Sequence, residues 1–188
     1  MVTDRGIIQK PYIDNFLKNK EVSYGDIGVR LKQSSTNVIV ASTDPFFTNN
    51  QFVVGDQILK INGKNIESSS LLMQKILFST QGKSIVFNIK RANKIKKIKI
   101  KVGNRYGGGL ISDTFLERHG LFFDNELLIK ESDSSRRLGL SVSDKLVSVN
   151  LKNVSSYSDI REVLSGAKEE VKLLFERDGF MFFIILKI

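Results

Sequence analysis

The sequence predicts a mainly β protein with short helices, of the α+β class, built as two partly closed β-barrel or sandwich modules. The first observation behind this prediction is an internal repeat, in which residues 54–66 align with residues 142–154 at a constant offset of 88 without a gap. The second is that apolar and polar residues alternate in short runs within both copies, as they do along half-buried strands. With 41% apolar and 26% charged residues, the chain can bury a core, which excludes a disordered or fibrous protein.

Each copy of the repeat predicts the same succession of elements. A turn containing Asp56 or Asp144 precedes an alternating strand and a second turn, and we interpret these two carboxylates as turn caps rather than catalytic groups. Serines then precede a short amphipathic helix, expected near 69–78 in the first copy and 157–165 in the second. Two strands close each copy, at 84–90 and 96–102 and at 170–176 and 180–188.

The domain organisation follows from the repeat and from three consecutive glycines at 107–109, which are costly inside any regular element. We expect an N-terminal segment at 1–20, a first module at 21–102, a glycine-rich linker at 103–112 and a second module at 113–188. The second copy is degenerate, because Ser143 and Leu151 stand where the first has the turn glycines Gly55 and Gly63.

The positive charge is concentrated in one part of the chain. Residues 68–112 carry 10 basic and no acidic side chains, whereas the whole chain has a net charge of +9. Within the basic stretch 90–105, Lys97, Lys99 and Lys101 alternate with isoleucines, which favours a strand with one solvated face. No aromatic side chains interleave with these lysines to stack on bases, so no nucleic acid is expected as a partner.

Several kinds of chemistry are excluded by composition. The absence of cysteine excludes thiolate catalysis and cysteine-ligated metals, and the single histidine, His119, excludes multi-histidine metal sites. We therefore expect no metal and no cofactor. No apolar stretch reaches the ~20 residues of a membrane helix, and the first twenty residues show no secretory signal, so no transmembrane segment is expected in this chain.

The apolar run at 180–186 is the longest in the chain. Its length and its position at the end of the second module predict a core strand buried on both faces. An oligomer-forming or membrane-inserting segment is the alternative interpretation.

The run GDQILKINGK at residues 55–64, followed by a capped helix and a strand that ends in arginine, resembles the PDZ domain, in particular the bacterial, circularly permuted type that accompanies envelope proteases. The second copy shares the resemblance mainly through its alignment with the first. The resemblance implies a recognition module that takes an extended peptide as an added strand between a strand and the helix, with backbone N–H groups of a preceding loop holding the terminal carboxylate.

The resemblance also implies which residues contact the peptide. In the first copy these are Tyr24, Gly25, Asp26, Ile27, Gly28, Val29, Leu31, Leu72, Met73 and Ile76, and in the second His119, Gly120, Leu121, Phe122, Phe123, Ile160 and Leu164. Asp26 departs from the family pattern, because it places a negative charge where an anion would bind. Phe122 also departs, since it replaces a second glycine.

The resemblance implies a non-enzymatic tandem PDZ-like adaptor or scaffold that binds peptide segments or C-terminal tails of partner proteins in a bacterial envelope or periplasm. One alternative is the regulatory part of a protease whose catalytic domain lies outside this chain. A less favoured alternative is a binder of anionic surfaces or nucleic acid through the basic stretch 90–105. The apolar end at Ile188 is expected to close the sheet of the second module, and weak self-association by docking of this end into the groove of a neighbouring molecule is the less favoured alternative.

Overall fold

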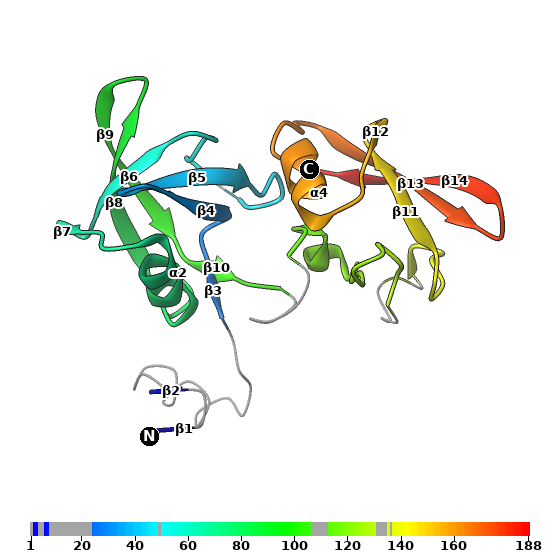
Figure 1. Cartoon of the computed structure of the whole chain (residues 1–188), viewed down its shortest axis with the longest axis horizontal. Helices are drawn as coiled ribbons and strands as arrows, with labels where there is room; N and C mark the ends of the chain where they lie inside the picture. Colours follow the sequence, from blue (N-terminus) through cyan, green and yellow to red (C-terminus); the bar gives the residue numbers. More distant parts are fainter. Residues whose placement is uncertain are drawn as a thin grey trace. The chain divides into compact units, whose positions relative to one another are not determined.

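The computed structural model describes residues 2–3, 6–7, 24–48, 50–106, 113–130, 135 and 137–188. The chain divides into two compact units (Figure 1). Unit 1 comprises Met1–Ser42 and Asn49–Gly109, and unit 2 comprises Thr43–Thr48 and Leu110–Ile188. The predicted fold class is confirmed, since the described residues form antiparallel sheets with two short α-helices and no closed barrel. The glycine triplet at 107–109 lies outside the described residues.

Unit 1 is built on one antiparallel sheet with a helix beside it. The strand order is β4 (Val29–Ser34), β5 (Asn37–Thr43), β6 (Gln57–Ile61), β8 (Ser84–Arg91) and β9 (Lys94–Lys101), with β7 (Lys64–Asn65) paired to β6. Helix α2 (Ser69–Leu77) begins after Ser68, whose side chain accepts the N–H of Leu71, and it buries Leu72 and Ile76.

Two short strand pairs lie outside this sheet. Strand β3 (Gly25–Asp26) pairs with β10 (Gly103–Asn104), which falls within the stretch predicted as a linker. Strands β1 (Val2–Thr3) and β2 (Gly6–Ile7) pair with each other within the predicted N-terminal segment.

Unit 2 repeats the second half of unit 1. Its sheet has the order β12 (Lys152–Asn153), β11 (Lys145–Val149), β13 (Glu170–Arg177) and β14 (Phe180–Lys187), with helix α4 (Tyr157–Leu164) and a 3-10 turn, η1 (Leu116–His119). The register shift between Ile58 and Lys60 in the β6–β8 pair recurs between Leu146 and Ser148 in the β11–β13 pair. The predicted repeat of turn, strand, turn, helix and hairpin is therefore confirmed for the described residues.

An ion pair between a buried aspartate and a partly exposed arginine occurs in the same place in each unit. Arg91 donates from Nε and Nη2 to the two carboxylate oxygens of Asp56 at 2.7 and 2.6 Å, and Arg177 donates to Asp144 at the same two distances. Each carboxylate also accepts the backbone N–H of the residue three positions earlier. The interpretation of both carboxylates as turn caps is confirmed. The hydrogen bonds from Arg177 lower the pKa of Asp144.

The predicted register of the lysine-rich strand is confirmed. Ile98 and Ile100 of β9 are 8% and 1% exposed, whereas Lys97, Lys99 and Lys101 are exposed. The lysines therefore form a solvated strand face.

The prediction that residues 180–186 are buried on both faces is wrong. Ile184 and Leu186 are buried, but Met181, Phe183 and Ile185 are each 54% exposed. The reason is that β14 is the last strand of its sheet, so that only one of its faces packs on the core. Among the described residues, no helix has the length and apolar composition needed to cross a membrane.

Replacing Lys97, Lys99 and Lys101 together by glutamine should change the free energy of unfolding by no more than ~0.5 kcal/mol for each residue, because all three are solvated. Ile100→Ala should instead cost ~2–5 kcal/mol, because it leaves a cavity at a buried position. Urea denaturation of the two variants measures the difference, and equal effects would contradict the register of β9.

The turn after β11 holds Leu151 with a left-handed φ of 65°, where unit 1 has Gly63 with a φ of 79°. Because a side chain disfavours this conformation, Leu151→Gly should stabilise the protein by about 1 kcal/mol, and Gly63→Leu should destabilise it by a similar amount. A Cβ at Gly63 would meet nothing within 4 Å, so the effect isolates backbone strain. Thermal unfolding that shifts in the same direction for both variants would rule out this explanation.

Candidate functional site

The predicted peptide site of the first copy lies between β4 and α2. β4 is an edge strand, and α2 lies against it and against β3 (Figure 1). Successive side chains of a strand alternate between its faces, so Val29, Leu31 and Gln33 share one face of β4. Ile27, Val29, Leu72 and Ile76 are buried, whereas Leu31 and Met73 are half-buried. Leu31 and Met73 are therefore the predicted apolar contacts that retain exposed surface.

Gly25 allows β3 to pass close to the carboxyl end of α2. A Cβ at this position would lie 2.3 Å from the carbonyl oxygen of Ile76 and 2.9 Å from a methyl group of Val102. Any side chain would push the helix away from the loop that precedes β4. Tyr24, also predicted to lie in this loop, is half-exposed, and its carbonyl oxygen accepts the N–H of Arg105 at 2.8 Å.

The loop before β4 already holds a carboxylate, that of Asp26. Asp26 Oδ1 accepts the backbone N–H groups of Ile27 at 2.7 Å and Gly28 at 3.0 Å, and Gly28 has a left-handed φ of 70°. Arg30 donates to both oxygens of the same carboxylate, at 3.0 and 3.3 Å. Asp26 is only 4% exposed. The N–H groups predicted to hold a ligand carboxylate are therefore bonded to one inside the chain.

A side chain connects the strand and the helix at the amino end of α2. Gln33 Oε1 accepts the backbone N–H of Ser69 at 2.9 Å, and its Nε2 donates to the carbonyl oxygen of Ser35 at 2.8 Å. Gln33 is exposed, so this connection is held in solvent. An added strand would meet Asp26 at one end of the site and Gln33 towards the other.

The predicted site residues of the second copy are mostly part of the core of unit 2. Leu121, Phe123, Ile160 and Leu164 are fully buried. Tyr157 of α4 donates its hydroxyl hydrogen to the carbonyl oxygen of Phe123 at 3.2 Å. Gly120, with its N–H bonded to the carbonyl of Glu117, and Phe122 are half-buried. The carbonyl oxygen of Phe123, which an added strand could use as an acceptor, is therefore bonded to Tyr157 of the same unit.

His119 packs against the stretch Thr43–Thr48, which sequence reasoning did not connect with it. Its ring meets that of Phe46 edge to face, with centroids 4.4 Å apart. Burial lowers the pKa of His119, and the neighbouring Arg118 lowers it further. Arg118 itself donates to Asp44 at 2.9 Å and lies over the ring of Phe47. These contacts fix the stretch within unit 2.

Glu117 is a buried acid that sequence reasoning missed. It is 4% exposed, and its Oε1 accepts both the backbone N–H and the hydroxyl hydrogen of Thr114 at 2.9 Å. Burial raises the pKa of Glu117 to about 7. The spacing of a threonine followed three residues later by a glutamate is typical of a capping box and could have indicated this contact.

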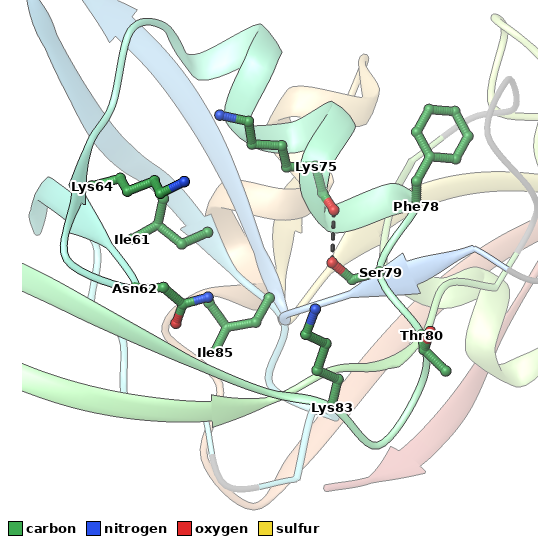
Figure 2. A pocket seen from close by; sticks show the side chains of 9 residues that line it. All are labelled: Ile61, Asn62, Lys64, Lys75, Phe78, Ser79, Thr80, Lys83 and Ile85. Carbon is green, nitrogen blue, oxygen red and sulfur yellow. Dashed lines mark hydrogen bonds between the residues drawn. The ribbon is translucent and has the colours of Figure 1, made fainter. Parts of the chain in front are cut away.

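Unit 1 also has a hollow of about 390 Å³ beside the carboxyl end of α2 (Figure 2). Its lining includes Lys64, Lys75 and Lys83 but no acidic side chain. The hydroxyl of Ser79 donates to the carbonyl oxygen of Lys75 at 2.7 Å. Three ammonium groups favour anions at this surface. Among the described residues, no group of histidines and acids is arranged to hold a metal ion.

Part of the chain is similar to a known family of domains. Residues 25–102 match the family model described as PDZ domain. A search of curated proteins found no match.

Solved structures similar to this chain include a serine-to-alanine variant of the HtrA-type protease AlgW with decapeptide, at 16% identity and a TM-score of 0.45 over 53% of this chain and 35% of that one. A serine endoprotease from Yersinia pestis is similar at 21% identity and a TM-score of 0.43 over 50% of this chain and 34% of that one. The chain spans about a third of the length of these structures.

The contribution of Glu117 to the stability of the protein should fall as the pH rises from 5 to 8. Between the unfolded pKa of Glu117, 4.5, and its folded pKa, about 7, the folded state keeps a proton that the unfolded state has released. The loss should approach about 3 kcal/mol above pH 7. Glu117→Gln should abolish this part of the dependence while leaving stability at pH 5 nearly unchanged.

Urea denaturation at several pH values tests this prediction. The exposed Glu126 provides a control, since Glu126→Gln should keep the pH dependence of the parent protein. His119 is present in all three proteins, so its own titration cancels in the comparison. A parent protein whose stability changes with pH in parallel with that of Glu117→Gln would contradict the assignment.

Proposed function

We propose that unit 1 binds an extended segment of a partner protein as a strand added to β4, and that the chain is a non-enzymatic adaptor. The observation that carries this proposal is the edge strand β4 lying beside α2 within the residues that match the PDZ family. Edge strands offer unpaired backbone groups, and a neighbouring helix supplies contacts for side chains of the added strand. Leu31 and Met73 would contact the apolar side chains of the segment.

The partner segment is internal to its chain rather than a C-terminal tail. The N–H groups of Ile27 and Gly28 already bond to Asp26, and Arg30 neutralises that carboxylate. A terminal carboxylate would meet a like charge and no free donor from these two residues. A segment without a terminal charge avoids both costs.

The proposal extends to the second unit and to the location of the protein. We infer PDZ-like modules at 21–102 and 113–188, the second with its groove closed by Tyr157 and with a structural role. The resemblance to bacterial PDZ domains favours an envelope or periplasmic location. It also supports the alternative of a regulatory part of a protease.

The proposal is tested with peptides selected from a random decapeptide library and synthesised with either a free C-terminal carboxylate or an amide. Isothermal titration of the parent protein should give the same affinity for both forms. Asp26→Ala removes the carboxylate bonded to the two N–H groups and paired with Arg30, so this variant should bind the carboxylate form about tenfold more tightly than the amide, a difference of about 1.4 kcal/mol.

Glu67→Ala removes an equal charge at an exposed position and should bind like the parent. Shifts in the NMR spectrum should map to β4 and α2. Shifts confined to unit 2 would exclude β4 as the site, and a parent protein that prefers the free carboxylate would exclude the internal segment.

A further inference from the structure

β14 is an edge strand whose outer side is unpaired among the described residues. Its pairing with β13 runs without a register shift from Arg177↔Phe180 to Glu170↔Lys187. The strand stands last in its sheet, after β13 in the twisted hairpin of Figure 1. In an antiparallel pair every second residue points its N–H and C=O groups away from the partner. These groups form a straight row that another strand can use.

The side chains of β14 do not protect this edge. Phe180 is 77% exposed, and Met181, Phe183 and Ile185 are each 54% exposed. Proteins normally guard an edge strand with lysines, proline or a bulge, and residues 180–186 contain none of these. A long, regular and apolar edge of this kind is a template for pairing with another chain.

The corresponding strand of unit 1 shows that the fold does not require an apolar surface here. Ile98 and Ile100 of β9 are buried like Ile184 and Leu186, which lie 86 residues later. On the opposite face, β9 has Lys97 and Lys99 at the positions of Phe183 and Ile185, and a single exposed isoleucine, Ile95, at the position of Met181. The exposed apolar residues of β14 are therefore not needed to form the core.

The charge of the hairpin favours a second copy of the same strand as the occupant. Residues 170–187 carry three acidic and three basic side chains, whereas residues 84–101 carry seven basic and none acidic. Two β9 strands would repel each other, but two β14 strands would not. An antiparallel register centred on Phe183 sets Met181 against Ile185 of the second copy and brings Lys187 beside its Asp178.

We propose that two copies of this chain associate by antiparallel pairing of β14 with β14 around a twofold axis at Phe183. The surface is separate from the proposed peptide site on β4. With a large side chain offering about 150–250 Å², the four exposed residues present roughly 450 Å² of apolar surface in each copy. Edge pairing covers these side chains only in part, against their neighbours on the added strand, so the buried area falls well below the roughly 1,200 Å² of stable complexes and the dimer is weak.

Cysteine cross-linking tests the register directly, because the chain contains no cysteine. In Phe183→Cys the two thiols should face each other across the twofold axis and form a disulfide-linked dimer on mild oxidation. Val142, also in unit 2 and 57% exposed but not part of β14, provides the control Val142→Cys. Val142→Cys should remain monomeric under the same conditions.

Sedimentation equilibrium of the unmodified chain measures the association itself. The apparent mass should rise above 21.2 kDa as the concentration approaches about 1 mM. The double variant Phe183→Lys with Ile185→Lys copies the residues of β9 and should weaken association by about tenfold or more. Val142→Lys adds a lysine elsewhere and should associate like the parent.

Circular dichroism melts establish that each variant is folded. A chain that stays monomeric throughout this range, or equal cross-linking of Phe183→Cys and Val142→Cys, would overturn the proposal. So would a monomer that floats with phosphatidylglycerol vesicles in a manner abolished by the double lysine variant, because the strand would then contact lipid. None of these outcomes depends on peptide binding by β4.

Discussion

The ion pair between a buried aspartate and a partly exposed arginine is the interaction on which both units are built. Asp56 is 1% exposed, and its carboxylate joins the turn before β6 to Arg91 at the end of β8. Asp144 and Arg177 make the same connection in unit 2. A carboxylate out of water is tolerated only when it is paired and hydrogen-bonded. The pair therefore fixes the order and register of the strands that carry the helix and the edge strands.

A second polar contact shared by the units holds the next turn. Asn62 Oδ1 accepts the N–H of Val86, and Asn150 Oδ1 accepts the N–H of Lys172, at 2.9 and 2.8 Å. Both asparagines have a left-handed φ, which this residue type adopts more readily than most others. With both turns fixed by side chains, the exposed strand faces are free to differ in sequence.

Sequence periodicity was sufficient to predict the position and register of elements whose two faces differ in polarity. The alternation around Ile98 and Ile100 gave the register of β9, and the serines before the two helices gave their starting points. It was insufficient for β14, because an apolar run has no period from which to tell a central strand from an edge strand. That distinction depends on neighbours far away in the sequence. The packing of Phe46 against His119 was missed for the same reason, since 73 residues separate them.

The candidate site, too, was predicted only in part from the sequence. Sequence reasoning placed Asp26 in the loop and noted its charge, but only the backbone geometry shows that Oδ1 turns back onto the N–H groups of Ile27 and Gly28. Arg30 lies four residues after Asp26 and pairs with its carboxylate. The sequence did not indicate this ion pair, because an arginine on a strand is ordinarily solvated. The groove of the second copy was likewise expected from its glycine and apolar residues. The hydroxyl of Tyr157, which occupies the Phe123 carbonyl, could not be anticipated without the orientation of α4.

The differences between the units lie at positions that the core leaves unconstrained. Buried residues of the two closing hairpins are equivalent, as Ile98 and Ile184 illustrate, because one face of each must pack on its own unit. The opposite face carries Lys97, Lys99 and Lys101 beside a single isoleucine in β9, whereas in β14 it carries Met181, Phe183 and Ile185, and packing does not explain that contrast. Burying the apolar face would gain roughly 25 cal/mol per Å², whereas leaving it in water gains nothing. A surface that costs solubility and contributes nothing to the core is best explained by contact with another chain.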